Sequence, residues 1–152
     1  MHDLPRKLSV DELAGLFEGR THFIERLAGM PNPLDEARAL LRRLPEDEQI
    51  EALNVHPRIG EKTLSTISAR EQGGDKDPAV LAELTRLNRA YGETFGFRFV
   101  VFVNQRSKAQ ILHVLKQRLT RTRAEELETA IDELVAIAED RHRRRLSATG
   151  LE

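Results

Sequence analysis

The segment around His56 is the part of this chain best suited to acid–base chemistry. Histidine has an unperturbed pKa of roughly 6.5, closer to working pH than that of any other side chain. Pro57 biases His56 toward extended backbone and Gly60 permits a tight turn, so the imidazole would stand on a defined, non-helical segment. An imidazole held on such a defined backbone is well placed to act as a general acid. A helix that ends at Val55 and leaves His56 exposed explains the same residues equally well.

A second polar cluster follows in the chain, and it has the Ser-x-x-Glu spacing of a helix capping box between Ser68 and Glu71. The amide groups at a helix start also attract anions. If Ser68 caps a helix, an anionic substrate group could bind there, with Glu71 and Gln72 beside it. A purely structural cap accounts for the spacing as well.

A third candidate is the apolar segment from Phe95 to Val103, which holds four of the six phenylalanines. Its period predicts a buried extended segment, yet the sequence offers no clear partner strand. Its backbone groups must therefore bond to side chains or water, or be offered to a ligand. The phenylalanines could wall a site for a flat heterocycle, fill a helical core, or do both.

The rest of the chain must position these segments, and its dominant period is helical. Ser9-x-x-Glu12 and Thr122-x-x-Glu125 are capping boxes, and Asp77-Pro78 reads as a helix start. The predicted helices are Ser9 to Phe17, Thr21 to Ala28, Leu34 to Leu44, Pro45 to about Asn54, one from Asp77, Ser107 to Leu119, and one from Thr122 that Arg141 to Arg145 should close. We expect an all-α fold of about seven or eight helices with one buried extended segment, in a single domain spanning residues 1–152.

Composition argues against several classes of function. The net charge of -1 gives no field for nucleic acid or an anionic membrane surface, and no apolar run approaches the ~20 residues of a membrane span. The first ten residues lack the apolar core of a secretory signal, so we expect a soluble, cytoplasmic protein. Cysteine is absent and the five histidines never fall at HxxxH or HExxH spacing, so no metal site is expected.

Taken in order, His56-Pro57, Ser68-x-x-Glu71-Gln72, Leu87-Asn88-x-x-Tyr91 and Phe95-Gly96-Phe97-x-Phe99-Val100 resemble the decarboxylase of 2-oxo-4-hydroxy-4-carboxy-5-ureidoimidazoline (OHCU) from urate degradation. The resemblance covers essentially the whole chain. It implies an all-α fold, commonly a homodimer, and a cofactor-free conversion of OHCU to (S)-allantoin with release of carbon dioxide.

The resemblance also implies roles for individual residues. His56 corresponds to the family's catalytic histidine, the expected proton donor. Our own hypothesis, from the chemistry, is that Glu71 orients His56 and raises its pKa. The implied substrate-binding residues are Pro57, Ser68, Ala69, Arg70, Glu71, Gln72, Phe99, Val100, Val101, Phe102 and Val103. Some relatives have proline at Arg98 and vary around Arg106, so these two arginines are left out of the catalytic set.

Two other functions fit the same residues. A hydrolase acting on a ureide could use the same pocket, and it would release no carbon dioxide. A non-catalytic helical interaction module would turn over no urate intermediate, and it has no need of a His-Pro turn or a Ser-x-x-Glu-Gln stretch.

Overall fold

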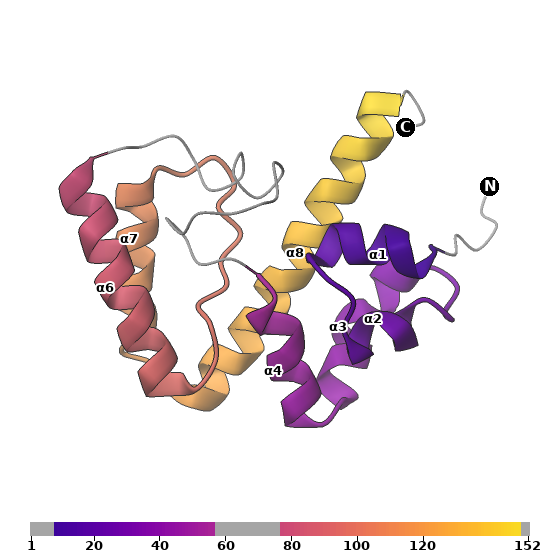
Figure 1. Cartoon of the computed structure of the whole chain (residues 1–152), viewed down its shortest axis with the longest axis horizontal. Coiled ribbons are helices and arrows are strands. Elements are labelled where there is room, and N and C mark those ends of the chain that lie inside the picture. The colour runs from indigo at the N-terminus through magenta and orange to yellow at the C-terminus, as the bar shows by residue number, and fades with distance from the viewer. Residues whose placement is uncertain (1–7, 57–76, 150–152) are drawn as a thin grey trace. The chain divides into compact units, whose positions relative to one another are not determined.

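The computed structural model describes residues 8–56 and 77–149 and confirms the all-α class (Figure 1). No strand occurs among these residues, and no helix among them is long and apolar enough to cross a membrane. The seven helices they contain are α1 (Val10–Phe17), α2 (His22–Leu27), α3 (Pro33–Arg43), α4 (Glu46–Asn54), α6 (Pro78–Phe95), α7 (Lys108–Arg118) and α8 (Arg123–Thr149).

The chain divides into two compact units, one of residues 1–55 and 131–152 and the other of residues 56–130. Helix α8 contributes residues to both. The first unit contains α1 to α4, with α2 in contact with the other three helices. The second contains α6, α7 and the non-helical segment between them. That residues 1–152 form one domain stays a prediction.

The helix starts predicted from capping side chains are confirmed, because these side chains make the expected bonds. The Ser9 hydroxyl accepts from the Glu12 amide at 3.0 Å, and the Glu12 carboxylate accepts from the Ser9 amide at 2.9 Å. Equivalent reciprocal pairs join Ser107 to Gln110 and Thr122 to Glu125. Each pair satisfies two amides that the helix itself leaves without partners.

The prediction that Arg141 to Arg145 close the last helix is wrong, because α8 continues through them to Thr149. No glycine or proline interrupts the sequence before Gly150. Arg143 and Arg144 both pair with Asp140 within the helix, which suits a helix interior. Arg141 is buried, with 3% exposure, so it serves the core and not the helix end.

Arg141 ties the end of α1 to α8 inside the first unit. Its guanidinium donates to the Leu16 carbonyl at 3.0 Å and pairs with the Glu18 carboxylate at 3.1 Å. Glu18 holds a left-handed backbone conformation, φ 70°, that a residue with a side chain adopts at a cost of about 1–2 kcal/mol. The ion pair explains why a glutamate occupies a position that favours glycine.

The second unit has an aromatic core around Tyr91 of α6. The ring centroids of Phe95, Phe97 and Phe99 lie 4.6, 6.0 and 5.3 Å from that of Tyr91. These four rings are buried. Phe95, Phe97 and Phe99 of the apolar segment therefore fill a helical core, as one of the two sequence interpretations held.

A group of charges is buried against this aromatic core. Glu126 of α8 is fully buried and accepts from Arg118 Nε at 2.7 Å, Arg121 Nη1 at 2.9 Å and the Tyr91 hydroxyl at 2.6 Å. Burial, together with this hydrogen bond to Glu126, raises the pKa of Tyr91 well above its usual range, so the phenol keeps its proton. We call Tyr91, Arg118 and Glu126 the buried polar cluster.

The first prediction concerns the strained position at the end of α1. Glu18→Gly relieves the left-handed strain but takes the carboxylate from a buried guanidinium, a loss of about 3–5 kcal/mol. We expect a net loss of about 2–3 kcal/mol in the free energy of unfolding, measured in urea. Gln105→Gly is the control, because Gln105 is exposed with φ 66°. Equal stabilisation in both variants would show that the ion pair contributes nothing.

The second prediction concerns the buried polar cluster. Glu126→Leu should lower the free energy of unfolding by about 3–5 kcal/mol, because it leaves the Arg118 charge buried without its carboxylate. The double variant Arg118→Met with Glu126→Leu should be more stable than Glu126→Leu alone, which a double-mutant cycle in urea measures. Gln117→Leu, an exposed change next to Arg118 on α7, should stay within about 0.5 kcal/mol of the parent. If the changes in the free energy of unfolding at Arg118 and Glu126 simply add in the double variant, the two side chains are not coupled and the prediction is contradicted.

Candidate active site

His56 lies at the point where the chain leaves α4. The helix ends at Asn54, and its C-cap Val55 still has helical backbone angles, φ -78° and ψ -16°. His56 follows outside the helix with 7% of its surface exposed. The alternative in which this histidine is simply exposed is therefore wrong.

The backbone of His56 is held by an arginine that the sequence interpretation had left out. Arg98 Nη1 donates to the His56 carbonyl at 2.8 Å, across 42 positions of sequence. Arg98 immediately precedes Phe99, where the predicted substrate-binding segment begins. The two described parts of the predicted site, His56 and residues 99–103, are thus joined by one side chain.

Residues 98–103 form neither helix nor strand, and Phe99, Val100, Val101 and Val103 are buried. Figure 1 shows this stretch as a long trace between the end of α6 and the start of α7. The structure confirms a buried segment without a partner strand in the described part of the chain, but it begins later than predicted, because Phe95 still belongs to α6. Its carbonyl groups must bond elsewhere.

Arginine side chains supply those bonds. Arg118 Nη1 donates to the Val100 carbonyl at 2.7 Å, and Arg106 donates to the carbonyls of Phe102 at 2.6 Å and Val103 at 3.1 Å. The Arg118 guanidinium also lies 4.7 Å from the centre of the Phe99 ring. The segment is thereby fixed at several points.

The segment ends in a tight turn. Asn104 and Gln105 both have positive φ, 49° and 66°, and the Arg106 amide donates to the Val103 carbonyl at 3.0 Å across them. Asparagine tolerates this left-handed region better than most residues. The turn aims Arg106 back at the segment that it stabilises.

Sequence reasoning missed Arg118 and Glu126, although a signal was present. Arg118 lies in helical register with buried Ile111 and Leu115, and Glu126 lies in register with buried Ala130 and Leu134. A charged residue within an apolar stripe indicates a buried ion pair. The sequence alone does not say which charges meet.

The remaining predicted site residues lie outside the described part of the chain. They are Pro57, Ser68, Ala69, Arg70, Glu71 and Gln72. Within residues 8–56 and 77–149, no group of three or more histidine, aspartate or glutamate side chains could hold a metal ion.

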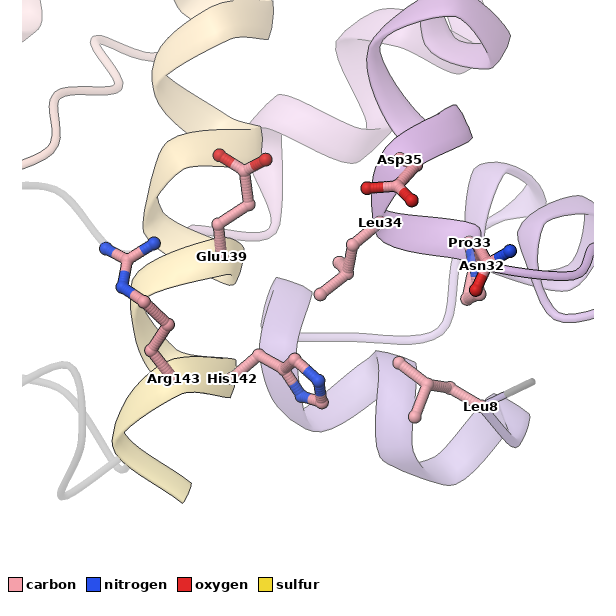
Figure 2. A pocket seen from close by; sticks show the side chains of 8 residues that line it. All are labelled: Leu8, Asn32, Pro33, Leu34, Asp35, Glu139, His142 and Arg143. Atoms are coloured by element: carbon pink, nitrogen blue, oxygen red, sulfur yellow. The ribbon is translucent and has the colours of Figure 1, made fainter. Parts of the chain in front are cut away.

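A cavity of about 320 Å³ lies in the unit of residues 1–55 and 131–152. Figure 2 shows its lining, with Glu139, His142 and Arg143 on α8 and Leu34 and Asp35 on α3. Glu139 already pairs with Arg38 at 3.1 Å. No residue of the predicted site lines this cavity, so it does not coincide with that site.

Comparison with known proteins gives one consistent result. Residues 2–143 match the family model of OHCU decarboxylase. The chain is 30% identical over 150 residues to the 2-oxo-4-hydroxy-4-carboxy-5-ureidoimidazoline decarboxylase of Haloferax volcanii, across 91% of this chain and 89% of that protein. It is 29% identical over 150 residues to the uric acid degradation bifunctional protein PucL of Bacillus subtilis, across 91% of this chain and 30% of that protein.

The structural comparison agrees. A crystal structure of OHCU decarboxylase in the presence of (S)-allantoin superposes with a TM-score of 0.74 and 26% sequence identity, across 90% of this chain and 98% of that one. The match extends over sequence and fold alike. The chain therefore belongs to the OHCU decarboxylase family, the carbon–carbon lyases of urate degradation.

Proposed function

We propose that this protein converts OHCU to (S)-allantoin without a cofactor and that His56 donates the proton. The assignment of this reaction rests on the family match over residues 2–143. It is supported by a fold similar to that of an OHCU decarboxylase solved in the presence of (S)-allantoin. The role of His56 is supported by its place in the chain, its burial and its fixed backbone.

The proposed reaction needs no cofactor because the substrate itself can accept the electron pair. Decarboxylation breaks the bond between the carboxylate carbon and the ring, and the electron pair must go somewhere. The neighbouring C=N group of OHCU accepts it, so the ring itself is the electron sink. The protein has to hold the carboxylate out of the ring plane and deliver a proton to one face of the intermediate.

His56 suits that proton delivery. A buried imidazole is shielded from bulk water, which would otherwise protonate either face. The bond from Arg98 fixes the backbone that carries the ring. A donor in one position yields one enantiomer of allantoin.

The segment from Phe99 to Val103 would hold the substrate through its backbone. Arginine side chains occupy the carbonyls of Val100, Phe102 and Val103. The carbonyls of Phe99 and Val101 are the remaining acceptors of this segment, and we propose that they take N–H groups of the ring and ureido moiety. Pro57 and residues 68–72 would complete the site, as the family resemblance implies.

Replacing His56 tests the proton donor. His56→Asn should lower the rate of (S)-allantoin formation at least about 10²-fold, because a general acid contributes roughly 10²–10⁴-fold. Fresh OHCU is generated with uricase and hydroxyisourate hydrolase, and the product is followed by circular dichroism. His113→Asn, which removes an exposed histidine of α7, should leave the rate unchanged.

Three outcomes would contradict this proposal in whole or in part. A wild-type protein that produces (S)-allantoin no faster than buffer would overturn the reaction itself. Consumption of OHCU without headspace carbon dioxide would point to a ureide hydrolase instead. A fully active His56→Asn variant would overturn only the role of the histidine.

A pH profile tests the proposed partnership of Glu71 with His56. A nearby carboxylate favours the imidazolium and raises its pKa, and the protonated ring is the form that donates. Activity should fall as pH rises through that pKa. In Glu71→Gln the fall should move to lower pH, which the rate of allantoin formation measured between pH 5 and 9 would reveal. An unchanged profile at full activity would rule the partnership out.

The family resemblance also supports a cytoplasmic homodimer, which we propose on that ground. Light scattering should then give twice the mass of one chain. A monomer at the concentrations used for the activity assay would contradict it.

A further inference from the structure

We propose that Arg98 is a positioning residue that holds His56 in a fixed relation to the substrate-binding segment. The inference rests on the proposed function, because it takes His56 as the proton donor and residues 99–103 as the segment that binds the substrate. Arg98 acts through His56 and is not itself a catalytic residue.

The first step in the argument is the bond itself. Arg98 Nη1 donates to the His56 carbonyl at 2.8 Å, and the contact is partly buried. A hydrogen bond from a charged donor is roughly twice as strong as one between neutral groups. His56 lies beyond the end of α4, and the Arg98 guanidinium ties its backbone to the segment that follows α6.

The second step is the anchoring of Arg98. Its neighbours Phe97 and Phe99 are buried in the aromatic core, while Arg98 is only half-buried. Two residues further on, the Val100 carbonyl is held by Arg118. The backbone from which Arg98 projects is therefore fixed, so a bond from its side chain transmits that fixed position to His56.

The third step is the consequence for catalysis. Proton transfer requires donor and acceptor at hydrogen-bond distance, and a displacement of about 1 Å costs on the order of 10²-fold in rate. Substrate bound along residues 99–103 would keep its contacts if Arg98 were shortened, whereas His56 would lose its fixed distance to that substrate. Loss of Arg98 should therefore lower kcat and leave KM nearly unchanged.

Three substitutions separate this role from a general contribution to stability. Arg98→Met keeps much of the apolar stem and removes the donors, and we expect kcat to fall about 10- to 100-fold. Arg98→Lys restores one charged donor for the His56 carbonyl and should recover most of kcat. Arg89→Met is the control, since Arg89 is exposed on α6 of the same unit.

A spectroscopic readout accompanies the kinetics. The imidazole signals of His56 are assigned by NMR from their loss in His56→Asn. They should shift or broaden in Arg98→Met and return in Arg98→Lys, while His113 stays unchanged. Allantoin formed by Arg98→Met should also have lower enantiomeric purity, because a loosely held donor reaches both faces.

The outcomes distinguish this inference from the proposed function. An inactive wild-type protein overturns the function. Active wild type and inactive His56→Asn, with Arg98→Met at full kcat or with only KM raised, overturn the role of Arg98 alone. If Arg98→Met does not fold, Arg98→Ala replaces it, since alanine also lacks a donor, and a folded Ala variant with wild-type kcat and unshifted His56 signals overturns the inference equally.

Discussion

A polypeptide that runs through a helical core without a neighbouring strand must find partners for its carbonyl groups, and this constraint shapes the second unit. Residues 98–103 are such a segment. Arg118 and Arg106 donate to three of its carbonyls, from α7 and from the turn that ends the segment. Side chains thus take the place of a strand, and they give a fixed non-helical backbone inside an all-α protein.

Because Arg118 donates to this segment from inside the core, its positive charge is buried and needs a negative partner. Arg118 is buried, and a buried guanidinium is stable only with a carboxylate and good hydrogen-bond geometry. Glu126 supplies the carboxylate and Tyr91 bonds to the same oxygen. The position of residues 98–103 therefore depends on α6, α7 and the start of α8 together, which explains why charged residues lie in otherwise apolar helix stripes.

Local signals in the sequence predicted the helices well, whereas contacts between residues far apart in the sequence could not be predicted from it. The capping boxes at Ser9, Ser107 and Thr122 involve residues three positions apart, so the sequence shows them directly. The bond from Arg98 to His56 spans 42 positions and that from Tyr91 to Glu126 spans 35. The burial of His56 and the route of α8 beyond Arg141 follow from such tertiary contacts, and spacing alone does not reveal them.

When the substrate carries its own electron sink, the protein mainly has to hold the substrate and the proton donor in a fixed geometry. Arginine is well suited to provide it, since a guanidinium donates in a fixed fork and cannot accept. Arginines can therefore satisfy the carbonyls of residues 99–103 but not the amides. Amides in such a segment need acceptors from another source, and in the site that we propose the carboxylate and carbonyl oxygens of the ureidoimidazoline would be acceptors of that kind. The arginine bonds that stabilise the segment are thus compatible with the substrate-binding role that we propose for it.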